Sequence, residues 1–382
     1  MDFDNYFHCI LSGRWRAMPI RFSEKRWARV KEDAALWWAG RLGRPLIHMP
    51  SGGLDPCRPE SRLKGLGFSE AMYNLSVPAE DIVDRWDCEL SRMAFHGDSF
   101  PVVWPNLGPG VLAAFVGGVA EPARDTVWFH PKADAELADL RMTYDPGNVW
   151  LRRVKDICRA AADRWQGLVQ VSMTDLGGSL DVVATFRPGT QLLTDLYDHS
   201  GDVKRQTWEA HRLWWRCFDE IDAVMRPVNP GYSSWANIYS EAPFYMLQCD
   251  FSYMIGPEMF DEFVLPELTA SCRRLENAFY HLDGVGELPH LDSLLGIREL
   301  KGIQWVPGEG RPGVTEWPHV YRKIRDAGKL IQVWGDMKTV DALASQLGSA
   351  EGLVCFSWGD PSRDATARDF LQKHGVPWGD DS

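Results

Sequence analysis

Short apolar runs alternate with amphipathic stretches through most of the chain. In the segment 244–310, three apolar runs at 244–249, 278–282 and 302–306 each end in a group of polar side chains. Between the first two runs, a stretch that begins at Pro257 carries apolar residues at the spacing of one buried helical face. The pattern predicts strand, helix, strand, helix, strand, and therefore a parallel sheet covered by helices.

The same alternation continues on both sides of this segment. Ser23 is expected to cap a first helix that ends at Gly43. We predict an α/β fold, a (β/α)8 TIM barrel with additional N-terminal helices. Residues 1–43 would form a helical extension packed on the barrel, and residues 44–382 the catalytic barrel domain. The other strands are expected at 45–50, 98–106 (with its exit loop), 168–173, 231–235, 330–334 and 353–356.

The polar groups that follow the apolar runs are the candidate active site. In parallel sheets and barrels, ligands and catalytic residues gather where the strands end at their carboxyl edge. One run ends in Cys249 and Asp250, the next in His281-Leu282-Asp283, and the third in a group that extends from Gln304 to Glu309. We therefore expect an enzyme whose site lies at this edge.

The same residues carry a family resemblance. The pattern Asp250-Phe251-Ser252, Gly256-Pro257, Phe260-Asp261-Glu262-Phe263, Leu265-Pro266 and then His281-Leu282-Asp283-Gly284 resembles the uroporphyrinogen decarboxylase superfamily. That superfamily also holds the zinc-dependent cobalamin-linked methyltransferases. The resemblance extends from about residue 44 to the C-terminus. It implies a barrel enzyme and raises two chemistries, methyl transfer and decarboxylation.

The methyltransferase branch implies a zinc site. Its members bind Zn2+ with a His-x-Cys pair and a later Cys; here His281 and Asp283 occupy the pair, and Cys355 follows at a similar distance. A carboxylate is a harder ligand than a thiolate, so another divalent metal is an alternative. Glu309 could supply a fourth ligand. The alternative interpretation is that His281 and Asp283 are hydrogen-bonded residues at the barrel mouth and that Cys355 is an inert buried thiol.

The decarboxylase branch uses no metal. The arginine-containing loop that grips substrate carboxylates in that branch is replaced here by Pro50-Ser51-Gly52-Gly53, so uroporphyrinogen itself is not the expected substrate. Asp98 lies near the branch's catalytic aspartate. The rival hypothesis is a metal-independent decarboxylase or lyase of a small aromatic or heterocyclic acid, with Asp98 or Asp283 handling the proton.

Further polar and aromatic side chains are expected around the substrate. Asp250 is the third candidate catalytic residue, beside Asp98 and Asp283. The candidate substrate-binding residues follow expected strands or open loops, and they are Trp104, Asp175, Arg187, Tyr239, Tyr253, Gln304 and Trp305. The leading hypothesis is a divalent-metal-dependent methyltransferase with a corrinoid protein or a free thiol as its partner. A non-enzymatic protein that binds a tetrapyrrole or corrinoid is a further alternative.

Composition narrows the class of partner. The formal net charge is −12 and the basic residues are dispersed, which argues against a nucleic-acid surface. No apolar run approaches the roughly 20 residues that span a bilayer, and no signal-peptide pattern opens the chain. The eight cysteines lack paired spacing, as in reduced proteins. We expect a cytoplasmic protein with a small-molecule substrate; a homodimer is left open.

Overall fold

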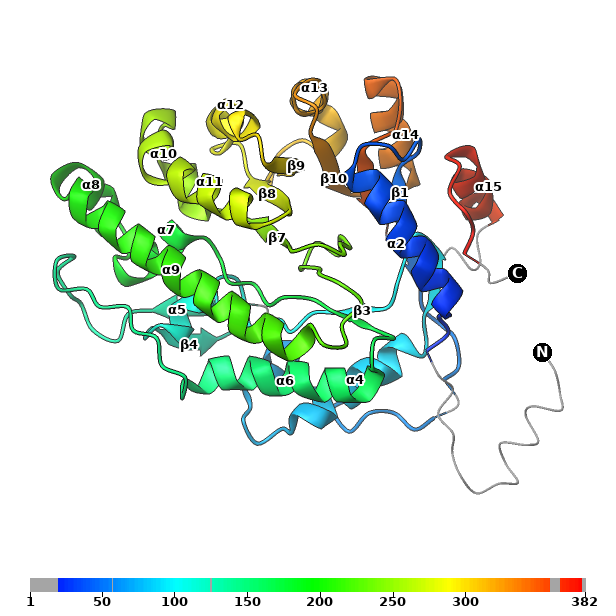
Figure 1. Ribbon diagram of the computed structural model, residues 1–382, viewed down its shortest axis with the longest axis horizontal. Helices are drawn as coiled ribbons and strands as arrows, with labels where there is room; N and C mark the ends of the chain where they lie inside the picture. The colour runs from blue at the N-terminus through cyan, green and yellow to red at the C-terminus, as the bar shows by residue number, and fades with distance from the viewer. Residues whose placement is uncertain (1–19, 57, 124–125, 358–364, 380–382) are drawn as a thin grey trace.

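A seven-stranded, mostly parallel sheet forms the centre of a mixed α/β fold (Figure 1). The computed structural model describes residues 20–379 except 57, 124–125 and 358–364. Neighbouring strands of the sheet run parallel, apart from the antiparallel pair β1–β2 at its edge. In sheet order the strands are β2 (Ala94–Gly97), β1 (Leu46–Ser51), β11 (Leu353–Phe356), β10 (Leu330–Trp334), β9 (Leu300–Val306), β8 (Asn277–Asp283) and β7 (Phe244–Leu247).

Two smaller sheets accompany the central one. β3 (Val102–Val103) pairs in parallel with β6 (Gln170–Val171), and β4 (Val119–Pro122) forms an antiparallel hairpin with β5 (Val127–His130). The predicted strand at 231–235 is wrong, because this segment forms only an isolated bridge between Tyr232 and Ser240. The other expected strands are present within a few residues of their predicted positions.

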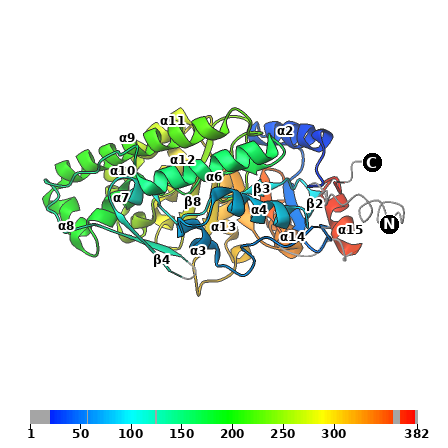
Figure 2. The ribbon, with the colours of Figure 1, turned by 90° about the horizontal axis from the view of Figure 1, so that it is seen from below.

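Helices cover the sheet along most of its length (Figures 1 and 2). The predicted first helix is confirmed, and the Ser23 side chain caps it by accepting a hydrogen bond from the Arg26 N–H at 3.2 Å. The α-helices are α2 (Glu24–Trp38), α3 (Phe68–Tyr73), α4 (Ala79–Leu90), α5 (Leu112–Phe115), α6 (Val149–Trp165), α7 (Ser179–Phe186), α8 (Gln191–Asp198), α9 (Ser200–Met225), α10 (Pro257–Phe263), α11 (Leu265–Arg274), α12 (Leu291–Gly296), α13 (Pro318–Asp326), α14 (Met337–Leu347) and α15 (Ala365–Lys373). Short 3-10 turns lie at η1 (Asp250–Met254), η2 (Leu288–His290) and η3 (Val314–Glu316).

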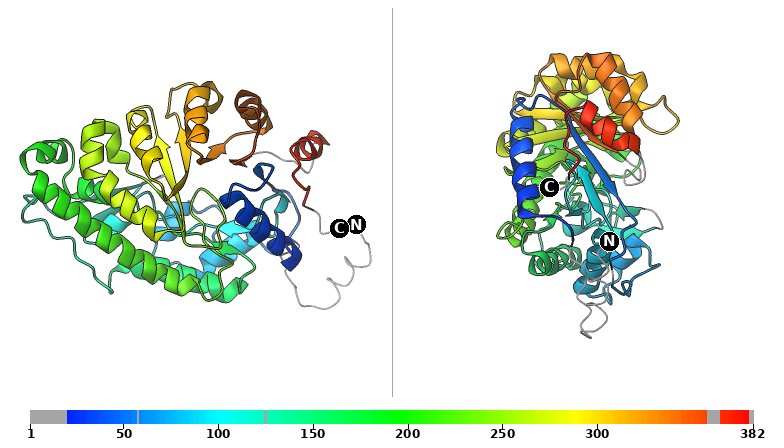
Figure 3. Two further views of the ribbon diagram at one scale, coloured as in Figure 1. Left: turned by 45° about the horizontal axis from the view of Figure 1, so that its top comes forward. Right: turned by 90° about the vertical axis from the view of Figure 1, so that its right-hand side faces the viewer.

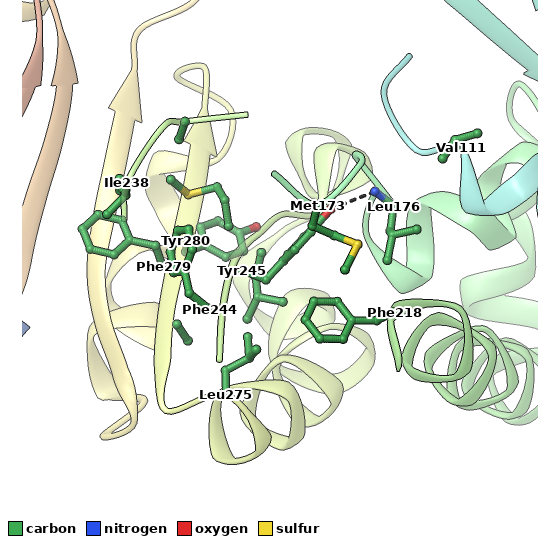
Figure 4. Close-up of a cluster of buried hydrophobic side chains, with 14 of the residues drawn as sticks. Val111, Met173, Leu176, Phe218, Ile238, Phe244, Tyr245, Leu275, Phe279 and Tyr280 are labelled. Atoms are coloured by element: carbon green, nitrogen blue, oxygen red, sulfur yellow. Dashed lines mark hydrogen bonds between the residues drawn. The ribbon is translucent and has the colours of Figure 1, made fainter. Parts of the chain in front are cut away.

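The central sheet has two faces of different character. Side chains alternate along a strand, and residues paired in register on parallel neighbours share a face. His281, Gln304 and Gln332 are paired in register and therefore share what we call the inner face. The opposite face, which we call the helix face, packs on the covering helices: Tyr245 contacts Trp214 of α9 with ring centroids 4.8 Å apart. Figure 4 shows Tyr245 together with buried side chains of both faces.

Helix α2 packs against the amino-terminal half of the inner face. Trp38 lies with its ring centroid 5.5 Å from that of Phe244 and 5.7 Å from that of Phe279, at the beginnings of β7 and β8. Gly302 makes room for Phe279, because a Cβ there would lie 2.1 Å from the Phe279 ring. Figure 3 shows α2 at the same end of the molecule as α15. Aromatic packing thus fills the amino-terminal half, which leaves the carboxyl half to polar side chains.

Within the described ranges, no helix combines the length and the apolar character that a membrane span requires.

Candidate active site at the carboxyl ends of the strands

A chain of three polar side chains crosses the inner face. The Nδ1 atom of His281 is hydrogen-bonded to the Oε1 atom of Gln304, and Nε2 of Gln304 donates to Oε1 of Gln332. An amide oxygen can only accept, so this arrangement assigns the imidazole proton to Nδ1. The Nε2 atom of His281 lies 3.8 Å from Oδ2 of Asp283. The imidazole is therefore oriented from one side and has a carboxylate on the other.

Carboxylates around His281 outweigh the effect of its burial. Only 13% of the His281 side chain is exposed, and desolvation alone would lower its pKa. The hydrogen bond and charge of Asp283, together with the charge of Asp250, favour the imidazolium. The net result is a pKa raised above the usual value of 6.5.

Asp250 faces this imidazole from the next strand. It opens η1 directly after β7 and is exposed to solvent. The surrounding protein desolvates the carboxylate and Asp181 repels its charge, which together raise the pKa of Asp250 to about 7. At neutral pH, a protonated and an ionised form of this carboxyl group therefore coexist.

Asp181 fixes the backbone that carries Asp250. Its carboxylate accepts hydrogen bonds from the backbone N–H groups of Gly178 at 3.1 Å, Asp250 at 3.1 Å and Phe251 at 2.8 Å. A Cβ at Gly178 would lie 2.3 Å from the carbonyl oxygen of Gln248, so only glycine permits this approach. Asp181 therefore ties the start of α7 to the start of η1.

Asp175 is buried beside the same group. Its Oδ1 accepts from the Gly177 N–H at 2.9 Å and lies 3.5 Å from the Tyr245 hydroxyl. The Tyr245 hydroxyl in turn accepts from the Leu176 N–H at 2.7 Å, the bond drawn in Figure 4. Burial raises the pKa of Asp175 to about 6, although the charge of His281 acts to lower it.

Glu287 lies beneath Asp283 as a neutral carboxylic acid. It is fully buried, and its Oε2 accepts a hydrogen bond from the Asp283 N–H at 3.2 Å. Desolvation and the neighbouring charge of Asp250 raise the pKa of Glu287 to about 10. Glu287 is therefore protonated at neutral pH, which limits the negative charge under the site.

A pocket of about 230 Å³ opens beside Asp283. Tyr253 of η1 forms part of its wall and packs against two glycines, because a Cβ at Gly284 or Gly286 would lie 2.9 or 2.7 Å from the Tyr253 ring. Glu309 follows β9 and also faces the pocket. The lining consists of Tyr253, Asp283, Gly284, Val285, Pro307, Gly308, Glu309 and Arg311.

Two tryptophans that we did not include among the predicted site residues extend from His281, Trp235 directly beside it and Trp334 beside Trp235. The Trp235 ring centroid is 4.8 Å from that of His281, with the rings nearly perpendicular, and 5.6 Å from that of Trp334. Trp334 is the last residue of β10 and is 37% exposed. Gln332 was missed as well. The available signal was that Gln248, Gln304 and Gln332 are isolated polar residues within or directly after short apolar runs.

One of the predicted zinc ligands, Cys355, lies apart from the other three. Cys355 is paired in register with Val333 and Ile47, and its neighbour Val354 is paired with Gln332. Cys355 therefore lies on the helix face, whereas His281 lies on the inner face. The thiol is fully buried, and this burial raises its pKa to about 12, far from a metal-binding thiolate. No group of three His, Cys, Asp or Glu residues in the described part of the chain is arranged to hold a metal ion, so the residues present do not fit the predicted site.

Asp98 also lies apart from His281. Both of its carboxylate oxygens are bound by the Arg44 guanidinium, at 2.9 and 3.0 Å, and one also accepts from the Ile47 N–H at 2.8 Å. Arg44 precedes β1, so this buried ion pair belongs to the amino-terminal half of the sheet. The prediction of Asp98 as a proton-handling residue is corrected to a structural role.

Four of the candidate substrate-binding residues lie outside the group around His281. Arg187 is held by a bidentate ion pair with Asp195 at the end of α7. Tyr239 donates to the Pro230 carbonyl oxygen and packs near α2, and Trp305 lies buried on the helix face. Trp104 follows β3 and is partly buried. The structure thus groups Asp175, Asp250, Tyr253, His281, Asp283, Gln304 and Glu309.

The resemblance to the uroporphyrinogen decarboxylase superfamily stays a prediction. Neither the family models nor the curated proteins that we searched match this chain.

Proposed function

We propose that this chain is an enzyme that catalyses metal-independent proton transfer on a small molecule, of the lyase or isomerase type. His281 and Asp250 are its acid–base pair. The observation that carries the proposal is the oriented imidazole: Gln304 holds Nδ1, and Asp283 lies 3.8 Å from Nε2. A base held by a third group is the recurring arrangement of acid–base sites.

His281 and Asp250 can each carry out one of the two proton transfers of an elimination reaction. Neutral His281 takes a proton from carbon at Nε2, the electron pair forms a double bond, and the carbon–oxygen bond on the next carbon breaks. Protonated Asp250 gives its proton to the departing oxygen, which leaves as water or an alcohol. The pKa of about 7 for Asp250 and the raised pKa of His281 suit groups that exchange protons near neutral pH.

The charge of the site favours an uncharged or cationic substrate. Asp175, Asp250 and Asp283 surround His281, and the pocket lining adds Glu309 against one arginine, Arg311. A substrate with several carboxylates would meet repulsion here. This preference counts against the predicted decarboxylation of an aromatic acid. Methyl transfer, bound zinc and a corrinoid partner stay predictions that no observation favours.

We also propose that the strands close into the predicted eight-stranded barrel, in which β3 and β6 fill the gap between β1 and β7. Two bonds support closure: the Asp98 N–H donates to the Ile47 carbonyl oxygen at 2.8 Å, and the Met173 N–H donates to the Ser233 carbonyl oxygen at 2.9 Å. Closure would bring the carboxyl ends of all the strands to one mouth.

Solvent-deuterium exchange tests the proposed chemistry and can be measured before the substrate is identified. Pooled small molecules are incubated in deuterated water with the protein and EDTA, and mass spectrometry detects the compound that gains deuterium. We expect exchange in EDTA and a loss of up to about 100-fold in kcat, with little change in KM, for Gln304→Leu, because the imidazole loses its anchor. Exchange that stops in EDTA and returns with zinc would contradict the proposal.

A further inference from the structure

We infer that the inner face binds a neutral, polyhydroxylated ring, such as a monosaccharide or a cyclitol, as the ligand of this site. The inference rests on the proposed function for its chemistry but on separate observations for the class of ligand. These are a set of buried polar atoms on the inner face, the Trp235 ring beside His281 with Trp334 next to it, and two carboxylates at the rim.

Four buried side chains carry polar atoms with no hydrogen-bond partner among the described residues. The atoms are Oγ of Ser172, Oγ1 of Thr174, Oε1 of Gln248 and Nε2 of Gln332. None of these residues is more than 5% exposed. Buried polar groups in proteins are almost always hydrogen-bonded. Unpaired atoms also occur in the packed core, such as the Tyr280 hydroxyl and Nε1 of Trp305, so it is the common position of these four atoms on the inner face that points to a polar ligand.

The alternation of side chains directs all four residues to the inner face. Gln332 is paired in register with Gln304. Leu247 is paired with Tyr280 on the helix face, so Gln248, the next residue, points the other way. Figure 4 shows Met173 beside Tyr245 and Phe218, on the side of the sheet that packs on α9, so its neighbours Ser172 and Thr174 face inward. The four groups thus lie on the same face of the sheet as His281.

The chemistry of these groups matches hydroxyl groups. The set contains a pure donor in Gln332 Nε2, a pure acceptor in Gln248 Oε1 and two hydroxyls that do both. All four are uncharged. A ligand hydroxyl both donates and accepts, so several hydroxyls on one ring can satisfy the whole set. A phosphate or carboxylate could not donate to Gln248, and an ammonium group could not accept from Gln332.

The tryptophans supply a surface for the ring itself. Trp334 is partly exposed, and Trp235 lies between it and His281. The apolar C–H face of a sugar or cyclitol packs on such an aromatic face. A ring on Trp235 would present its C–H bonds to the imidazole.

The carboxylates at the rim complete the match. Asp250 and Asp283 are both solvent-exposed, and each carboxylate can accept two hydroxyl hydrogen bonds. Asp250 and Asp283 thus add hydrogen-bond acceptors at the rim to the four uncharged groups of the inner face.

Direct binding tests this inference. Glucose, galactose, xylose and myo-inositol are titrated into the full chain, with calorimetry and tryptophan fluorescence as readouts; choline, putrescine and citrate are the charged comparison set. We expect at least one of the four neutral compounds to bind with a Kd of about 1 mM or tighter, and the charged set to bind more weakly. Trp235→Ala and Gln332→Leu should each weaken binding at least about tenfold, and Ser172→Ala should weaken it too.

Trp128→Ala is the matched control, because Trp128 is a 61% exposed tryptophan on the β4–β5 hairpin. It should leave binding unchanged, and circular dichroism confirms that each variant is folded. The inference is overturned if no neutral compound binds, if a charged compound binds and Trp235→Ala abolishes that binding, or if folded Gln332→Leu and Ser172→Ala both bind as the wild type does.

The two proposals can fail separately. His281→Asn should still bind the neutral ring but should lose deuterium exchange. Binding of a neutral ring without exchange in the wild type would leave the ligand class intact and overturn the proposed function. Deuterium exchange confined to charged compounds would leave the proposed function intact and overturn the ligand class.

Discussion

Replacement of His281 by asparagine should lower kcat by about 10²- to 10⁴-fold, the range for loss of a general acid or base. Asparagine can still bond to Gln304, which accepts from Nδ1 in the wild type, but it cannot take up a proton. The fold should survive because the shape and the inner-face hydrogen bond are largely kept. The measurement is the rate of solvent-deuterium exchange on the substrate found by screening, with thermal unfolding as the check of stability.

Cys355→Ala is the control that separates this account from the metal hypothesis. Cys355 is as deeply buried as any core residue but lies on the helix face. We expect this variant to lose some stability and to keep the wild-type exchange rate. A loss of exchange in Cys355→Ala comparable to that in His281→Asn would mean that the thiol takes part in the chemistry, contrary to the register of β11.

Glu287 should make the stability of the fold fall as the pH rises. Its folded pKa of about 10 lies above its usual value of 4.5, so the folded state holds this proton more tightly than the unfolded state. The contribution is fully present below pH 4.5 and is lost as the pH rises toward the folded pKa. Between these limits, one proton corresponds to a slope of up to about 1.4 kcal/mol of unfolding free energy per pH unit.

Glu287→Gln should remove this slope. The amide keeps an oxygen that can accept from the Asp283 N–H and never ionises. Denaturant unfolding of the wild type and the variant at several pH values between about 5 and 9 measures the difference. The variant should become the more stable protein as the pH rises, whereas Glu276→Gln, at an exposed position, should follow the wild type. Parallel curves for the wild type and Glu287→Gln would show that Glu287 is not held neutral.

The strands and helices could be predicted because their signals are local. The apolar runs at 278–282 and 302–306 became β8 and β9, and the stretch after Ser23 became α2. The positions of Asp250, His281 and Asp283 at strand ends followed from the same runs. Such elements depend on the periodicity of a few neighbouring residues, which the sequence displays directly.

Which residues belong to the site depends on the register of the strands. Register is set by pairing between segments that are far apart in the sequence. Adjacent residues of a strand face opposite sides, so the choice between Val354 and Cys355 as the inner residue of β11 is made by its pairing with β10. The chain distance between His281 and Cys355 carries no information on this choice. A shift of β11 by a single residue in its register with β10 would have placed Cys355, rather than Val354, on the inner face.

Contacts between residues far apart in the sequence explain the other differences between the predicted and the observed site. Asp98 was predicted near the site because it lies near the catalytic aspartate of the resembling decarboxylases, but in the structure its carboxylate is bound by Arg44, 54 residues earlier. Trp235 lies in an irregular segment that was expected to be a strand, and only the folded chain brings it to His281. The lone glutamines of the apolar strands were the one local signal of a polar interior.

The most direct test of the central claim is an NMR titration of the His281 imidazole, assigned with the His281→Asn variant. An oriented base between carboxylates predicts a neutral tautomer protonated at Nδ1 and a pKa above the usual 6.5 that falls in Asp283→Asn. A pKa at or below 6.5, unchanged by Asp283→Asn, or a neutral form protonated at Nε2, would contradict it.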